Sequence, residues 1–441
     1  MFVFTRRAIQ QMLYGIAPWM PAIPLAELVS RLNTPYTNRL PQMWEVAWLY
    51  ALGSVVKIEH ERPLPGGKPD LWFNVRSNGS DVQVIADITT LSDTTLHELN
   101  PFEKLSEAVH KQARKAGLEG GGFHIRAEHF ESIIKDGKKV QLLIPTGPAF
   151  EQLVKKQIKP FANKVATDPL RPQRLDIDES GAKFTVDYKG PSEYSQGSHR
   201  SYNVTLSPKK NVLYNRLNDK TSQLRGAPDG AVRMLVICDG DCTLLRENRP
   251  LEGLNSQHIV QSFLQGSQTI DIVLLVTVLD NGRTIFQRRD PMRVECRMVA
   301  APTRPVHLTD EVLLSIKRVF DEAIKELPTP NMMPHNALRR NLDSEWSRSM
   351  EGGISINQIR IKVSARAVLE LLAGVMTHER FAELHRFSQG ELNIFASRLA
   401  SGQLISSAKV ERLGSDNDDD WLEFEFAPPD PAVSKFIISP T

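Results

Sequence analysis

Two aspartates, Asp70 and Asp87, flank a segment whose pattern is that of a tight β-hairpin. The dipeptide Asn78-Gly79 between them is favoured in type I′ turns, because both central residues of that turn need positive φ. A two-residue turn at this point places Asp70 directly opposite Asp87, and opposed residues have Cβ atoms about 4.5–5.5 Å apart. Two carboxylates that close repel each other unless a cation lies between them. The hairpin therefore predicts a Mg²⁺ site, since Mg²⁺ prefers a few carboxylate oxygens with water completing its shell.

The same register gives the hairpin one apolar face. It pairs Val75 with Val82, Phe73 with Val84, and Leu71 with Ala86. Trp72 opposite Ile85 indicates that the second face, which carries the aspartates, is also partly covered. The alternative is that both aspartates are solvated residues at strand ends, as in many hairpins.

The segment resembles the signature of the PD-(D/E)XK, or restriction-endonuclease-like, nucleases. The matching residues are Pro69-Asp70 and, after a gap, Ala86-Asp87-Ile88-Thr89. The resemblance implies a mixed sheet flanked by helices, with Asp70 and Asp87 as Mg²⁺ ligands. The family places a lysine two positions after the second acidic residue, where it helps to activate the attacking water. This sequence has Thr89 there, so another residue would have to supply the positive charge.

Lys220 is the first candidate for that charge. It lies in a helix expected over residues 210–224, on the same face as an apolar stripe formed by Leu213, Leu217 and Leu224. A lysine on a core-facing stripe is costly unless an acidic partner or a functional site receives it. Gln223 lies one turn further on. The resemblance implies that such a helix-borne Lys or Gln reaches the active site. The alternatives are that Lys220 extends outward along its aliphatic stem, or that Lys68 supplies the charge.

Glu45 is a third acidic candidate, on a helix expected over residues 43–52. The resemblance implies an acidic residue on the first core helix, facing the metal. Glu45 shares a face with Trp48, Leu49 and Leu52, which is unusual for a solvated glutamate. The alternative is an ordinary glutamate on the helix surface.

The remaining pattern predicts how the chain is divided. Helices and apolar strands alternate over 210–279, which is typical of an α/β layer arrangement. We expect a nuclease-like core formed by residues 1–92 and 208–300, interrupted by an α/β insertion over 93–207. Pro302 and Pro305 indicate a linker, and residues 301–441 are predicted to form a mostly helical C-terminal domain.

Composition excludes some classes of protein. The formal net charge of +2 is too small to demonstrate a nucleic-acid partner, although a local basic groove would suffice. Three cysteines in 441 residues favour a reducing compartment and offer only one close pair, Cys238 and Cys242, for a zinc site. No apolar run approaches the roughly 20 residues that span a bilayer. We therefore expect a cytoplasmic protein without a membrane partner.

Together these features predict a Mg²⁺-dependent nuclease that hydrolyses the phosphodiester bonds of nucleic acid. DNA is the expected substrate, and Mn²⁺ could replace Mg²⁺. Asp70 and Asp87 would bind the metal with help from Glu45, and Lys220 would act with Gln223 to stabilise charge and activate water. The resemblance suggests a role in prokaryotic antiviral defence or repair. The competing class is a non-catalytic nucleic-acid-binding or assembly subunit, and homo-oligomer or protein contacts would involve the C-terminal domain. A nuclease held inactive until a partner releases it is a third possibility.

Overall fold

The computed structural model covers the 441-residue chain. It describes residues 2–34, 37–93, 101–118, 121–134, 137–179, 181–192, 195–199, 207–246, 255–280, 292–303, 305–342, 355–356, 360–378, 381–382, 385, 394–414, 419–430 and 432–433.

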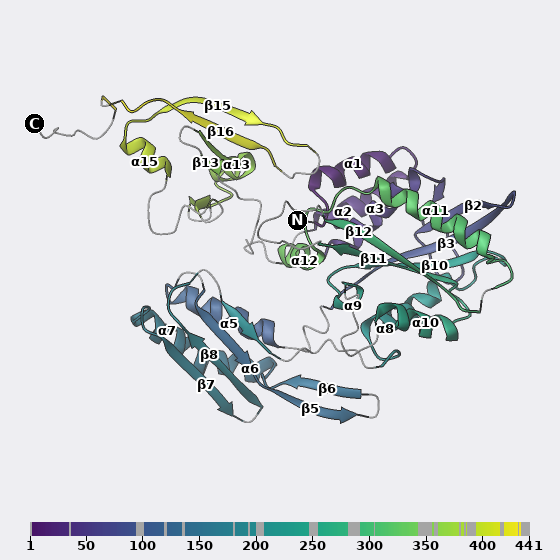
Figure 1. Cartoon of the computed structure of the whole chain (residues 1–441), viewed down its shortest axis with the longest axis horizontal. Helices are drawn as coiled ribbons and strands as arrows, with labels where there is room; N and C mark the ends of the chain where they lie inside the picture. The colour runs from purple at the N-terminus through teal and green to yellow at the C-terminus, as the bar shows by residue number, and fades with distance from the viewer. Residues whose placement is uncertain are drawn as a thin grey trace, which may run out of the picture.

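A six-stranded mixed sheet lies at the right of Figure 1, with strands in the order β1-β2-β3-β10-β11-β12. Its strands are β1 (Ile58–Glu59), β2 (Leu71–Ser77), β3 (Ser80–Leu91), β10 (Val232–Asp239), β11 (Ile272–Leu279) and β12 (Arg293–Ala300). β3, β10 and β11 run parallel to one another, and the other pairs are antiparallel. β10 and β11 are almost continuously apolar, as is typical of parallel strands buried on both faces.

Helices cover both faces of this sheet, so the core has three layers. One face packs against α3 (Leu40–Gly53) and α11 (Asp310–Glu326). Three further helices pack on α3 in the same cluster: α1 (Arg6–Ile16), α2 (Ala22–Asn33) and α12 (Pro334–Leu342). The opposite face packs against α8 (Val212–Thr221), α9 (Thr243–Arg246) and α10 (Ser256–Gly266). A mixed sheet flanked by helices confirms the predicted α/β class.

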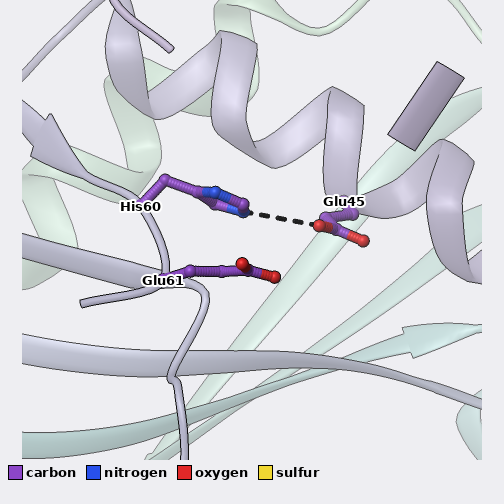
Figure 2. Close-up of side chains that lie close together, drawn as sticks. All are labelled: Glu45, His60 and Glu61. Carbon is purple, nitrogen blue, oxygen red and sulfur yellow. Dashed lines mark ion pairs between the residues drawn. The ribbon is translucent and has the colours of Figure 1, made fainter. Parts of the chain in front are cut away.

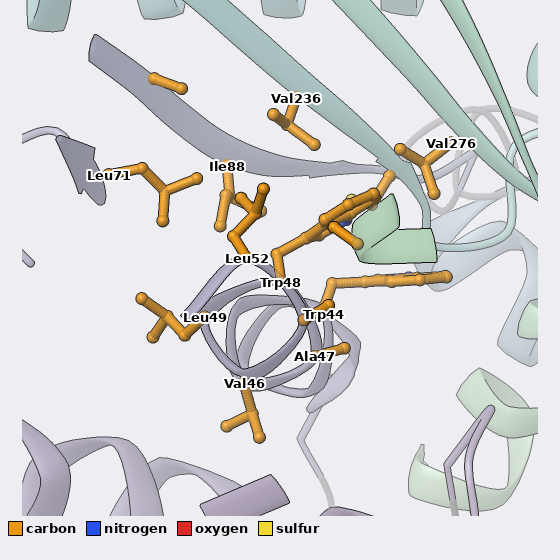
Figure 3. Close-up of a cluster of buried hydrophobic side chains, with 14 of the residues drawn as sticks. Trp44, Val46, Ala47, Trp48, Leu49, Leu52, Leu71, Ile88, Val236 and Val276 are labelled. Carbon is orange, nitrogen blue, oxygen red and sulfur yellow. The ribbon is translucent and has the colours of Figure 1, made fainter. Parts of the chain in front are cut away.

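α3 is anchored to the sheet by two fully buried tryptophans. Figure 3 shows Trp48 and Leu52 on the side of the helix that faces Ile88 and Val236, while Val46 points away from the strands. The Trp48 ring packs at an angle against Phe320 of α11, with centroids 5.5 Å apart. Truncating such a buried tryptophan costs about 3–5 kcal/mol. This packing therefore holds α3, and the Glu45 that it carries, firmly against the sheet.

The hairpin register is confirmed over its full length, from Leu71 opposite Ala86 to Ser77 opposite Ser80. Asn78 and Gly79 have φ values of 49° and 81°, as a type I′ turn requires. The paired strands end at Leu71 and Ala86, one pair before Asp70 and Asp87, because Asp70 lies just before β2.

Residues between the two halves of the core form a cluster of apolar side chains of their own. A four-stranded sheet contains β4 (Phe123–Ala127), β7 (Gln173–Glu179), β8 (Ala182–Tyr188) and β9 (Gln196–Ser198). The helices are α5 (Phe102–Lys115), α6 (Gly147–Leu153), the π-helical turn η1 (Val154–Ile158) and α7 (Lys159–Thr167). A separate hairpin is formed by β5 (His129–Ile134) and β6 (Gly137–Leu142).

The sequence predicts a mostly helical C-terminal domain from residue 301, and the described residues there form both helices and strands. α11 belongs to the core, because its buried face packs on α3 and β2. Beyond it lies a four-stranded antiparallel sheet of β13 (Ser355–Ile356), β14 (Arg360–Ser364), β16 (Trp421–Phe426) and β15 (Ile405–Glu411). α13 (Ala365–Leu372) and α15 (Ile394–Ala400) accompany these strands. Among the described helices, none combines the length and hydrophobicity needed to cross a lipid bilayer.

Candidate functional site

Asp70 and Asp87 lie together at the open end of the β2–β3 hairpin. Asp70 Oδ2 accepts a hydrogen bond of 2.6 Å from the backbone N–H of Ile88, the residue that follows Asp87. Burial raises the pKa of Asp70 well above its usual value, and the negative charges of Asp87 and Glu45 raise it further. The three carboxyl groups are therefore close enough to disfavour one another's ionisation.

Asp87 points to the face of the sheet that α8 covers, and its side chain is only 2% exposed. Burial raises its pKa, and the positive charge of Lys220 opposes that rise. Lys220 Nζ lies 2.9 Å from Asp87 Oδ2, yet within the described residues this buried oxygen makes no hydrogen bond of acceptable geometry. The distance therefore describes an ion pair that leaves acceptor capacity on the oxygen. An under-satisfied buried carboxylate oxygen beside a second carboxyl group is a suitable donor set for a divalent cation.

Lys220 reaches this position from the last turn of α8. The helix begins at the N-cap Asn211, whose side chain accepts a hydrogen bond of 2.8 Å from Tyr214 N. The three leucines of the predicted apolar stripe, Leu213, Leu217 and Leu224, are buried. Lys220 remains on the inner side with its side chain 21% exposed, and it donates a hydrogen bond of 2.7 Å to Gln223 Oε1. Two acceptors thus hold its ammonium group, whereas the alternative Lys68 is exposed.

Thr89 lies close to Asp87 in the sequence. It lies two residues after Asp87 on β3, so the two side chains share a face of the sheet. Thr89 is buried. The ammonium group at this face therefore comes from a helix distant in sequence and not from the strand itself.

A glycine contact joins the segment before Asp70 to the turn that carries Gln223. A Cβ on Gly66 would lie 2.2 Å from Ser222 O and 2.6 Å from Arg225 O. No side chain fits there, so the close approach requires glycine. The neighbouring Leu64 and Gly67 exchange backbone hydrogen bonds of 2.7 and 3.2 Å, which close the turn. This packing fixes the two halves of the site relative to each other.

Glu45 lies beside two residues that sequence reasoning did not identify, His60 and Glu61. Figure 2 shows the side chains of all three converging, with His60 Nε2 3.4 Å from Glu45 Oε1. Arg31 approaches the other Glu45 oxygen at 3.5 Å. Glu61 has a φ of 51°, an uncommon value for a residue with a side chain. That conformation follows the two-residue strand β1, and the sequence carries no periodic signal that could have revealed it.

A separate carboxylate network lies at the end of β10. Burial raises the pKa of Asp239 to about 6, although Arg246 opposes this with Nε 3.5 Å from Asp239 Oδ2. Asp239 Oδ1 accepts hydrogen bonds of 2.9 Å from Asp241 N and Cys242 N. These hydrogen bonds hold the turn after β10, so the role of Asp239 is structural. Burial raises the pKa of the Cys242 thiol well above its usual value, which does not favour the thiolate that zinc needs.

No protein-family model, no curated protein and no solved structure matches this chain. The chemistry of the site must therefore be inferred from its geometry.

Proposed function

We propose that this chain is a Mg²⁺-dependent nuclease with a restriction-endonuclease-like core. It would hydrolyse the phosphodiester bonds of nucleic acid, with DNA as the expected substrate. The observation that carries the proposal is the meeting of Lys220 with Asp87, next to Asp70, on one side of the sheet. An acidic pair with an adjacent ammonium group is the combination that metal-assisted phosphodiester hydrolysis needs. Here the ammonium group comes from α8 in place of Thr89.

The acidic residues fit a divalent cation by charge and by donor type. Asp70 and Asp87 would hold Mg²⁺ or Mn²⁺, and Glu45 is close enough to influence both carboxyl groups electrostatically. Three carboxylates against the two cations beside them, Lys220 at Asp87 and Arg31 at Glu45, leave an excess of negative charge that a bound cation would offset. When bound, such an ion lowers the pKa of a coordinated water and stabilises negative charge on a phosphate.

Lys220 is positioned to stabilise charge that develops during the reaction. Its ammonium is a compact positive charge with three donors, of which one is donated to Gln223 Oε1, while Asp87 Oδ2 pairs with the charge at 2.9 Å. A third donor remains for a phosphate oxygen or for the attacking water. Because Gln223 already holds the group, little reorganisation is needed when charge develops. Gln223 would thus act as a positioning residue.

The exposed lysines of the helix formed by η1 and α7 are the proposed contacts to the nucleic-acid backbone. They are Lys155, Lys156, Lys159 and Lys164. Contacts of this kind are independent of base sequence and weaken steeply as salt rises. The modest net charge of +2 is compatible with one local basic surface.

The test is a cleavage panel with single- and double-stranded DNA and RNA in Mg²⁺ or Mn²⁺. The wild type is compared with Asp70→Ala and Lys220→Ala, and with the exposed control Lys209→Ala. Cleavage that both site variants lose and the control retains supports the nuclease. Binding of nucleic acid without cleavage in either metal would contradict it and favour a non-catalytic binding subunit.

A further inference from the structure

A second potential metal site adjoins the first and uses three residues from two elements. Glu45 extends from α3, and His60 and Glu61 directly follow β1. One ligand atom from each residue lies within 4.8 Å of the others. Figure 2 shows the His60 ring and the Glu61 carboxylate both directed towards Glu45.

The state of His60 is independent evidence for a ligand. Its side chain is only 2% exposed, and within the part of the chain that the structure describes neither ring nitrogen makes a hydrogen bond. A buried imidazole that makes no hydrogen bond has lost its hydration without an equivalent replacement. Its Nε2 faces Glu45 Oε1 at 3.4 Å, the side on which a shared ion would lie.

The spacing of the ligand atoms suits a first-row metal ion. With metal–ligand bonds of about 2.1 Å, adjacent ligands lie about 3 Å apart and opposed ligands about 4.2 Å apart. The 3.4 Å between His60 Nε2 and Glu45 Oε1 is close to the adjacent value. All ligand atoms of the cluster lie within 4.8 Å of one another, so binding as opposed ligands requires the side chains to approach by at most about 0.6 Å.

We propose that Glu45, His60 and Glu61 bind a divalent first-row transition-metal ion, at a site distinct from the Asp70–Asp87 pair. The imidazole determines the choice of ion, because neutral imidazole suits transition metals, whereas Mg²⁺ and Ca²⁺ prefer oxygen ligands. Arg31 competes for Glu45 at 3.5 Å, but its side chain is 48% exposed and is free to move away. The proposal deepens the proposed function through the shared Glu45, but it concerns metal binding alone.

Calorimetric titration with Co²⁺ tests the stoichiometry in the full chain. An Asp70→Asn background weakens the first site, so the remaining Co²⁺ binding should come from the second. We expect one Co²⁺ per chain in that background, and at least a tenfold loss of affinity when His60→Gln or Glu61→Gln is added. The exposed His258 on α10 provides the matched control, His258→Gln, which should change nothing.

Pulsed electron paramagnetic resonance of bound Mn²⁺ detects nitrogen ligation directly. The ¹⁴N modulation of an imidazole ligand should be present in the wild type and absent in His60→Gln. Unchanged modulation in that variant, absence of modulation in the wild type, or equal Co²⁺ affinity in all variants would each overturn the site. Mg²⁺-dependent cleavage that Asp70→Asn abolishes and His60→Gln retains would support the nuclease alone, so the two proposals fail separately.

Discussion

Lys220 Nζ and Asp87 Oδ2 lie 2.9 Å apart, although one residue belongs to a helix after the insertion and the other to the hairpin before it. The pair is possible because β3 and β10 are parallel neighbours, and α8 packs on the face of the sheet to which Asp87 points. Thr89 cannot provide a positive charge at this face.

Replacing Lys220 with methionine should abolish cleavage while replacing Lys68 should not. Methionine keeps much of the aliphatic stem but removes the ammonium that pairs with Asp87. Loss of one charge-stabilising or proton-handling group lowers a rate by about 10²–10⁴-fold. Single-turnover cleavage of labelled DNA in Mg²⁺ measures the effect. The exposed Lys68 is the matched control, and a larger loss in Lys68→Met than in Lys220→Met would reverse the assignment.

Asp70→Asn should make the metal-free protein more stable while it removes Mg²⁺ binding. Asparagine keeps an oxygen that can accept the Ile88 N–H, and it relieves a buried charge next to Asp87. A gain of about 1 kcal/mol would raise Tm by roughly 1–2 °C in a chain of this size. Because the pKa of Asp70 is raised in the folded state, its stabilising contribution is full at low pH and is lost as pH rises. The difference in Tm between variant and wild type should therefore widen from pH 5 to pH 8.

Thermal unfolding in a chelator, repeated in excess Mg²⁺, measures this difference. Mg²⁺ should stabilise only the wild type and so reduce the gap. A variant that is less stable than the wild type at pH 8 without metal would show that Asp70 has a structural role.

Asp239 should give the protein a separate pH dependence. Its folded pKa of about 6 exceeds the unfolded value of about 3.9, so its stabilising contribution is complete below about pH 4. That contribution is lost as pH rises through 6. The Tm of Asp239→Asn relative to wild type should consequently be higher at pH 7 than at pH 5. A Tm difference that is constant across this range would show that Asp239 does not titrate there.

Gly66→Ala should disturb the contact between the two halves of the site. The added Cβ would overlap the carbonyl oxygens of Ser222 and Arg225, which are backbone atoms that cannot rotate away. Overpacking of this kind costs about 1–3 kcal/mol. Gly266 has open space around its Cβ position, so Gly266→Ala is the control. Thermal unfolding and cleavage should both be impaired in Gly66→Ala only, and wild-type behaviour of that variant would contradict the contact.

Local sequence rules predicted the hairpin, because turn chemistry at Asn78-Gly79 and the alternation of apolar residues act over a few positions. The burial of Lys220 was also predictable, since a charge on an apolar stripe is visible in the sequence. His60 and Glu61 were missed because long-range packing of α3 against a two-residue strand brings them to Glu45.

Strand β15 in the C-terminal sheet was missed for a related reason. β15 (Ile405–Glu411) is exposed along its whole length, so no alternation of buried and exposed residues marks it as a strand. α11 was predicted to lie in the C-terminal domain instead of the core, because an apolar helix face does not indicate which sheet it covers. Periodicity predicts the type of an element and not its partner.

The most direct test of the central claim is a double-mutant cycle of Mn²⁺ affinity for Asp70 and Asp87, measured in a His60→Gln background. If both carboxylates bind one ion, Asp70→Asn and Asp87→Asn should each remove most of the affinity, and the double variant should lose little more. Independent, additive losses, or binding unaffected by either change, would contradict a shared metal ion between the two residues.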